Sequence, residues 1–458
     1  MNSSAAPAVE KRWRSCANFL PLLIILTQAS AAGSQESTAA ADSTLSEPAS
    51  PEESKVDAKH RRIVKAVSRA NPVAATGQTA RWVSKRRQFN LLGVPYGFTG
   101  LPIVFPSANT GFNYGFKVNW VDYRRKPYRY KVTVYWVQST EGRYTYAVRL
   151  KVPRISGTGF GLRLQASSLN DIRARYYGLS NDSVNNQDFL DPDHADFRDE
   201  NYYYYVLNLP RFIFSLLRHI HGPVAMSAGF GLEKTDVDPR GIRSFYQEEE
   251  RGDLIIDGVT GFLSATLYYD TRDDPTIPKS GTFHEWSYET SRNSVLGLFF
   301  EEIDFQRYTV TDARYIPLSP RLNLAHRTIF EALKGSVPLY AYGELGGSRR
   351  QKGVGGSSSL RGFDRQRFTD NIRLFTNTEL RYQLQKTRAF RQYLEWHAVA
   401  FLDAGEVAPG VADLTAGRLH WTGGFGLRLY WNADFVIRTD VAFSSEQTGL
   451  LLKYSNVF

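Results

Sequence analysis

Apolar and polar side chains alternate at every second position in one segment after another, from residue 110 to the C-terminus. The segment GFNYGFKVNW (111–120) places aromatic and aliphatic residues on one face and Asn or Lys on the other. The segments YRYKVTVYWV (128–137) and YTYAVRLKV (144–152) repeat this pattern after the turn-forming sequences RRKP and STEGR. A period of two, with turn residues between the segments, predicts antiparallel β-strands.

The same pattern along the whole chain predicts about 16 strands, an even number as in bacterial membrane barrels. The predicted strands are 88–104, 110–123, 128–139, 143–155, 158–177, 201–216, 223–236, 260–273, 281–292, 300–318, 322–335, 371–385, 393–406, 419–431, 435–445 and 449–458. Short connections such as RRKP, SGTG and NAD contrast with the long connections 178–200 and 237–259. We expect the short connections at the periplasmic end and the long ones outside.

Composition separates a membrane barrel from a soluble sandwich. Phe, Trp and Tyr make up 14% of the chain, yet the mean hydropathy of −0.36 is that of a polar protein, because alternation cancels in the average. A sandwich also alternates, but it would need further layers to cover so many apolar faces. A barrel needs only lipid around it, and its closed sheet pairs every backbone group. We therefore predict an all-β fold: a single transmembrane antiparallel β-barrel over residues 87–458.

The N-terminal 86 residues have a different character. Positive charge (EKRWR), a short apolar run (ANFLPLLIIL) and small residues (TQASAA) follow one another, as in a secretory signal peptide, here residues 1–31. The apolar run is shorter than the about 20 residues that a membrane helix needs. Residues 32–86 are rich in Ala, Ser, Thr, Glu and Pro, which predicts a disordered low-complexity leader. The signal predicts export, and with the barrel it predicts the bacterial outer membrane.

The sequence gives little support for nucleic-acid binding, catalysis or metal binding. The net charge is +10, but Lys and Arg are scattered along the chain, so we expect no nucleic-acid partner. Neither a nucleophile–base signature nor a cofactor motif occurs, and we expect a protein that is not an enzyme and holds no cofactor or metal. The acidic loop NQDFLDPDHAD (186–196) lacks the spacing and glycine of a calcium loop, so a solvated surface loop is favoured over a calcium site.

The glycine-rich segment GVGGSSSLRGFDRQRF (353–368) is the strongest candidate for a functional element. It lies between two predicted strands, where a long outer loop can fold back into the lumen. Arg361 would then need a carboxylate partner, because an unpaired charge away from water is costly. Strand alternation directs Glu379 and Asp403 to the lumen from neighbouring strands, and an arginine–carboxylate pair is strong when it is bidentate and sheltered.

Two further motifs lie at a turn and at the chain end. The segment YYDTRDDPTIPKSGTF (268–283) resembles a periplasmic turn motif of the barrel family named below, with Asp270, Arg272, Asp273, Pro278 and Gly281 at the motif positions. The last segment, GLLLKYSNVF (449–458), predicts a terminal strand with Phe458 on the lipid face. A terminal aromatic residue is typical of outer-membrane barrels, and the expected insertion signal consists of Gly449, Leu452, Tyr454 and Phe458.

Together, GGSSSLRGF, FLDAG, the turn motif and the terminal Phe resemble the outer-membrane protein assembly factor superfamily, also called the bacterial surface antigen barrel. The resemblance covers residues 260–458 well and 88–260 through the barrel pattern. It implies that Arg361, Gly362 and Phe363 form a loop tip lodged in the lumen, with Asp403 and Glu379 as partners. It also implies a 16-stranded barrel whose first and last strands pair weakly, forming a lateral gate.

The implied function is to assist insertion or translocation of proteins at the outer membrane. Its expected partners are outer-membrane lipid, unfolded outer-membrane protein clients and other assembly factors. The leader, of about 55 residues, is too short for one of the family's periplasmic docking domains, so the sequence resembles barrel-only members. Two alternatives remain open: a passive pore, and an outer-membrane lipid-modifying enzyme with an outward-facing Ser or His.

Overall fold

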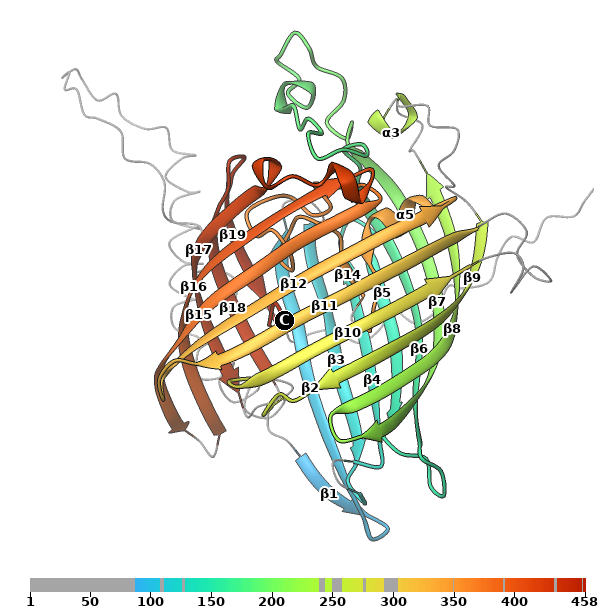
Figure 1. Cartoon of the computed structure of the whole chain (residues 1–458), viewed down its shortest axis with the longest axis vertical. Helices are drawn as coiled ribbons and strands as arrows, with labels where there is room; N and C mark the ends of the chain where they lie inside the picture. The colour runs from blue at the N-terminus through green and yellow to red at the C-terminus, as the bar shows by residue number, and fades with distance from the viewer. Residues whose placement is uncertain are drawn as a thin grey trace, which may run out of the picture. The chain divides into compact units, whose positions relative to one another are not determined.

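The protein is represented by a computed structural model, and Figure 1 shows its strands wrapped into a barrel. The structure describes residues 87–107, 111–125, 128–238, 244–248, 258–274, 277–291, 304–348, 350–389, 392–431, 435–454 and 456–458. The predicted signal peptide (1–31) and leader (32–86) both lie outside the described residues. Within the described ranges, no helix is both long enough and apolar enough to cross a membrane.

Sixteen strands of the described chain form the wall. They are β2 (Val94–Ser107), β3 (Gly111–Asp122), β4 (Tyr130–Ser139), β5 (Tyr144–Val152), β6 (Phe160–Arg175), β7 (Tyr204–His221), β8 (Val224–Asp238), β9 (Gly258–Asp270), β10 (Gly281–Thr290), β11 (Phe305–Pro317), β12 (Leu322–Gly335), β15 (Ile372–Ala389), β16 (Gln392–Ala408), β17 (His420–Trp431), β18 (Phe435–Phe443) and β19 (Thr448–Lys453). Each pairs antiparallel with its neighbours in chain order, and β19 stands beside β2 in the strand order. The predicted single antiparallel barrel of about 16 strands is confirmed.

Smaller elements complete the described chain. The strand β1 (Arg87–Leu91) forms a hairpin with β2. The short elements η1 (Gln187–Phe189), α3 (Phe245–Glu248), η2 (Val411–Asp413) and η3 (Ala416–Arg418) lie in the connections at one end of the barrel, and tight turns lie at the other (Figure 1). The elements α5 (Leu339–Tyr342), β13 (Glu344–Leu345) and β14 (Gln351–Lys352) belong to the segment between β12 and β15.

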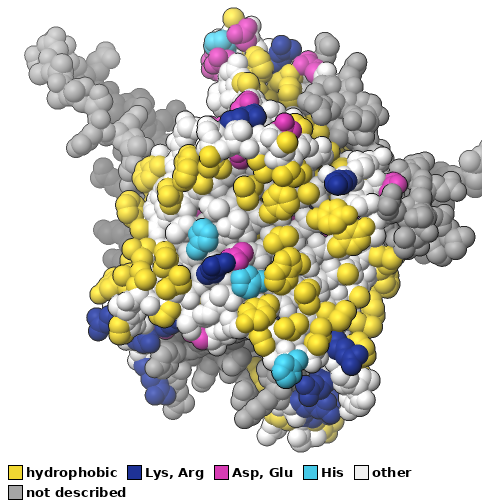
Figure 2. Space-filling view, in the orientation of Figure 1, with side chains coloured by type: hydrophobic (Ala, Val, Ile, Leu, Met, Phe, Trp, Pro, Cys, Tyr) yellow, Lys and Arg dark blue, Asp and Glu magenta, His cyan; other side chains and the backbone are white. Residues whose placement is uncertain are grey.

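The barrel wall is apolar outside and charged inside, which is the reverse of a soluble protein. On β15, for example, Leu380 and Tyr382 are 41% and 43% exposed on the outer face, whereas Glu379 and Arg381 are buried on the inner face. Hydrophobic side chains accordingly cover much of the outer surface in Figure 2. Because successive residues of a strand point to opposite faces, the period of two in the sequence dictates this arrangement.

Candidate functional site

The segment between β12 and β15, residues 336–371, folds into the barrel lumen, and we call it the lumen loop. Its apolar residues Leu360, Phe363 and Phe368 are buried in one cluster with residues of the inner wall, among them Ile329 and Phe375. A loop buried this deeply must satisfy its own polar groups. The hydrogen-bond and ion-pair partners of these polar groups lie in the turns of the loop itself and on the charged inner wall.

Glycine allows the tip of the lumen loop to turn tightly. Gly355, Gly356 and Gly362 have φ angles of +105°, +87° and +96°, which residues with a side chain rarely adopt. A Cβ atom on Gly355 would also lie only 2.3 Å from the carbonyl oxygen of Asp364. Ser359 Oγ accepts a hydrogen bond from the Gly355 amide at 2.9 Å and closes the turn. The glycine-rich sequence therefore makes a compact tip with a defined direction.

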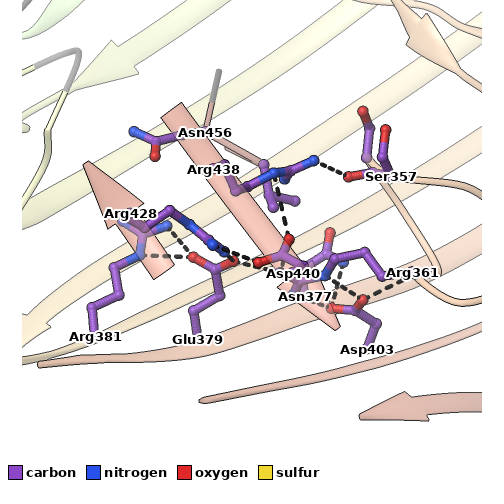
Figure 3. Close-up of polar contacts among 12 residues, drawn as sticks. Ser357, Arg361, Asn377, Glu379, Arg381, Asp403, Arg428, Arg438, Asp440 and Asn456 are labelled. Carbon is purple, nitrogen blue, oxygen red and sulfur yellow. Dashed lines mark hydrogen bonds and ion pairs between the residues drawn. The ribbon is translucent and has the colours of Figure 1, made fainter. Parts of the chain in front are cut away.

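Arg361 stands at this tip and is fully buried, with 0% of its side chain exposed (Figure 3). Its Nε and Nη2 donate to Asp403 Oδ2 and Oδ1 at 2.8 and 2.7 Å, a bidentate pair. Its Nη1 donates to Glu379 Oε1 at 2.7 Å, and its guanidinium lies 3.5 Å from the ring centroid of Phe401. The structure thus brings together Arg361, Asp403 and Glu379, which the sequence had selected.

A wider charged network surrounds the pair, and strand alternation alone did not single it out. Asp440 of β18 lies 3.5 Å from Arg361 Nη1, and we call Arg361 with Asp403, Glu379 and Asp440 the tip anchor. Arg428 pairs with both Glu379, at 3.0 Å, and Asp440. Figure 3 also shows Asn377, Arg381 and Arg438, which belong to the same network. The alternation of β18 places Asp440 on the inner face, which is the signal that could have found it.

Gly362 and Phe363 fix the tip beside Arg361. Ser444, in the turn between β18 and β19, donates from Oγ to the Gly362 carbonyl at 3.0 Å. A Cβ atom on Gly362 would come within 3.4 Å of Ala442 and Ser444, so the tip lies close against this wall. The ring of Phe363 packs edge-on against Phe368 at 5.1 Å between centroids.

A second set of ion pairs holds the start of the lumen loop to other strands. Glu344 accepts from Arg211 of β7 at 2.6 Å. Arg350 lies 3.3 Å from Glu233 of β8 and donates to Glu289 of β10 at 3.0 Å. We call Glu344 and Arg350 with these three partners the base anchor. Because its members are separated by more than 100 positions in places, sequence spacing gave no sign of it.

Two connections at the same end of the barrel contact the lumen loop. Arg367 donates from Nη1 to Ser183 Oγ at 2.7 Å and from Nε to Glu446 Oε1 at 2.8 Å, and so joins two outer connections. Asp364 forms an ion pair with Arg175 and accepts from the Tyr177 hydroxyl at 3.0 Å. Burial alone would raise the pKa of the Asp364 carboxyl, but the Arg175 guanidinium and these hydrogen bonds hold that pKa below its ordinary value.

The predicted turn motif has a local structural explanation. Arg272 donates to both carboxylate oxygens of Asp270, at 2.8 and 2.7 Å. The Asp273 carboxylate accepts from the backbone amides of Lys279 and Ser280 at 2.9 and 3.1 Å. Gly281 has φ +94°, and a Cβ atom there would lie 2.2 Å from the Thr271 carbonyl oxygen. Pro278, the remaining motif residue, is buried in the turn.

The chain end differs from its prediction. The last strand, β19, ends at Lys453 rather than 458, so it contains Gly449 and Leu452 of the expected insertion signal but neither Tyr454 nor Phe458. Phe458 is buried with Ala313 and Tyr315 on the inner wall instead of facing lipid.

Cationic partners explain why the chain turns inward. The Phe458 ring lies 5.0 Å from the Arg327 guanidinium and 5.1 Å from that of Arg381. Arg327 also donates to the Val457 carbonyl at 3.3 Å and to the Ser358 carbonyl at 2.6 Å. One arginine of β12 thus contacts both the lumen loop and the chain end.

The acidic loop 186–196 is organised by local hydrogen bonds. The Asn186 side chain accepts from the Asp188 amide at 3.0 Å, and Asp191 accepts from the Asp193 amide at 3.0 Å. His194 lies 3.8 Å from Asp196. In the part of the chain that the structure describes, no group of three or more His, Cys, Asp or Glu residues is placed to hold a metal ion.

Comparisons with known proteins support the barrel architecture. The Omp85 superfamily domain model matches residues 106–448. The solved structure of BamA from Haemophilus ducreyi lacking POTRA domains 1-3 has a TM-score of 0.50 and 12% identity, over 80% of this chain and 69% of that chain. CdiB from Escherichia coli has a TM-score of 0.49 and 12% identity, over 80% of this chain and 62% of that chain. A search of curated proteins found no match. Because the family match spans most of the sequence, the chain belongs to the Omp85 superfamily of outer-membrane β-barrels.

Proposed function

We propose that this protein assists the insertion or translocation of polypeptides at the outer membrane, with the lumen loop as a reversible plug. The tip anchor is the observation that carries the proposal. Three inward-facing carboxylates, from β15, β16 and β18, surround one loop residue, Arg361, although a permanently closed barrel could be filled with apolar side chains at no electrostatic cost. A network of paired charges can exchange partners with water when the loop leaves.

The lateral gate is the second part of the proposal. The closing strand, β19, has 6 residues, whereas its neighbour β18 has 9 and β2, on its other side, has 14. A short strand offers few backbone hydrogen bonds, so we place the gate at β19, on the side where it stands beside β2 in the strand order. A client strand could pair with either edge there.

The expected partners are outer-membrane lipid, unfolded outer-membrane protein clients and other assembly factors. The geometry does not favour a passive pore, because the lumen loop is buried and anchored from two directions. The expected insertion signal, Gly449, Leu452, Tyr454 and Phe458, also stays a proposal. The burial of Phe458 favours a role of that ring in securing the chain end inside the barrel.

A client-folding assay tests the function. The full chain would be reconstituted in liposomes, and an unfolded small outer-membrane barrel protein would be added as the client. We expect the client to become heat-modifiable on a gel several-fold faster than with empty liposomes. A disulfide between cysteines placed in β2 and β19 should abolish this increase in the folding rate of the client. Equal rates with and without the protein would contradict the assembly function.

A large steady conductance in a planar bilayer would instead support the passive pore. The Arg361 variants described in the Discussion separate these outcomes further, because only a plugged barrel changes its conductance when the tip is released.

A further inference from the structure

The outer wall carries a group of ionisable side chains that the lumen chemistry does not use. Figure 2 shows charged and histidine side chains gathered in the middle of an otherwise apolar wall. The residues are His284 of β10, Asp312 and Arg314 of β11, and His326 of β12. Register places them side by side: His284 opposite Asp312, and Arg314 opposite His326. We call these four residues the wall cluster.

Their neighbours show that the wall cluster faces the membrane. On β11, Tyr308 and Ile316 share the face of Asp312 and Arg314 and are 40% and 46% exposed, whereas Ala313 and Tyr315 point inward and are buried. Asp312 lies five residues from the nearer end of β11. With a rise of about 3.3 Å per residue and a tilt of about 45°, that end is roughly 12 Å away along the membrane normal. This places the carboxylate near the middle of the apolar band.

The four residues partly satisfy one another. Arg314 donates from Nε and Nη2 to Asp312 at 2.9 and 3.2 Å, and His284 Nδ1 lies 2.8 Å from Asp312 Oδ2. His326 is bonded on both ring nitrogens, to Thr378 and Thr328. Two groups remain without a partner among the described residues: Arg314 Nη1, on a side chain 59% exposed, and His284 Nε2.

Ionisable residues at this depth are costly against lipid and are expected to have a function and a partner. The partner must present polar groups at the same depth. Two copies related by a two-fold axis along the membrane normal have the same residues at the same depth. A second copy of this chain therefore presents polar groups at the depth of the wall cluster. The wall cluster is also self-complementary. His284 Nδ1 faces a carboxylate and is the donor atom of the ring, which leaves the opposite atom, Nε2, as the acceptor for Arg314 Nη1 of the second copy.

We propose that the protein forms a two-fold dimer through the outer faces of β10, β11 and β12, with Arg314 of each copy bonded to the wall cluster of the other. Polar side chains that find partners are a main source of association between proteins within lipid, where apolar burial contributes little. In the strand order, β10 to β12 stand about half-way round the sheet from the seam between β19 and β2. The dimer therefore leaves the seam free, and the inference stands independently of the proposed function.

Disulfide trapping tests the dimer. The native Cys16 would be replaced by Ser, and one cysteine introduced as Val310→Cys, on the outer face of β11 beside Asp312. Val148→Cys, on the outer face of β5, is the matched control. The full chain would be reconstituted at low density in phosphatidylcholine vesicles, which supply no anionic lipid, and oxidised. We expect at least tenfold more disulfide-linked dimer from Val310→Cys than from Val148→Cys.

Removing the polar contacts should remove the dimer. Asp312→Asn combined with Arg314→Gln should lower the Val310→Cys yield at least fivefold, with heat-modifiable migration confirming a folded barrel. Should that variant fail to fold, His284→Phe provides the test, because it removes the Nε2 acceptor and leaves the Asp312–Arg314 pair in place. Equal trapping at both cysteine positions, or trapping that is unchanged by these substitutions, would overturn the proposal, as would a dimer that appears only when anionic lipid is added to the vesicles.

Discussion

The tip anchor and the base anchor of the lumen loop hold one segment by different means. At the tip, one guanidinium, Arg361, makes contacts to Asp403 and Glu379 and also stacks on Phe401. At the base, two residues of the loop, Glu344 and Arg350, each form ion pairs with the wall. Their wall partners also pair with each other, since Arg211 lies 2.7 Å from Glu233.

This difference teaches where the loop is vulnerable. Loss of one base residue leaves the wall partners neutralised by one another. Loss of Arg361 leaves Asp403 with Asn377 as its remaining partner among the described residues. We therefore expect the tip to act as the release point of the loop and the base as a hinge that stays attached.

Replacing Arg361 should have the largest effect. Arg361→Ala leaves a buried carboxylate without its cation, a loss of about 3–5 kcal/mol in the anchoring of the tip. In planar bilayers we expect a small, quiet conductance for the wild type and a larger, fluctuating one for the variant. A variant that conducts like the wild type would show that the tip does not restrict the lumen.

A smaller effect is expected at the base. Glu344→Gln keeps the side-chain shape and removes one charge, and Arg211 retains Glu233, so the loss is about 1–2 kcal/mol. The same bilayer recording should show conductance close to that of the wild type. If Glu344→Gln opens the barrel as widely as Arg361→Ala, the two anchors are equivalent and the hinge interpretation fails.

The chain end should contribute less to the loop and more to local order. Phe458→Ala removes the ring beside Arg327 and Arg381, with an expected loss of about 1–2 kcal/mol in stability. Thermal unfolding of the detergent-folded barrel, followed by the gel shift on heating, would measure it. A normal stability combined with a strong defect in insertion would instead support the role of Phe458 as an insertion signal.

The smallest effect concerns the N-terminal region. Deletion of residues 33–80 should leave the strand-dominated circular dichroism spectrum and the heat-modifiable migration of the barrel unchanged, because the low-complexity sequence cannot contribute a core. Loss of folding on deletion would show that the leader has a structural role.

The sequence predicted best those features that follow from the period of two along a strand. Alternation predicted the strands, and it also directed Glu379 and Asp403 inward, so the partners of Arg361 followed from strand geometry. It failed where the answer depends on contacts across the lumen. The base anchor joins β7, β8 and β10 to a distant loop, and no local pattern reports such a contact.

The chain end shows a second limit. Alternation continues formally from Leu450 to Phe458, so periodicity alone extended the last strand to residue 458. The strand ends at Lys453 because the following residues find better partners inside, where Arg327 and Arg381 flank the Phe458 ring. Similarly, the polar residues of β11 and β12 occur at alternate positions, so periodicity alone does not mark them as unusual. Only the arrangement of neighbouring strands shows that the wall cluster gathers on the outer face.

Limited proteolysis of the lumen loop tests the central claim most directly. The full chain in lipid nanodiscs would be treated with trypsin, which can cut after Lys352, Arg365 and Arg367 if residues 350–370 become accessible. We expect the wild type and Glu344→Gln to be protected and Arg361→Ala to be cut there. Arg361→Lys should be intermediate, since an ammonium cannot span two carboxylates as the guanidinium does. Equal protection of the wild type and Arg361→Ala, or equal cleavage of both, would contradict the account that Arg361 holds the loop in the barrel.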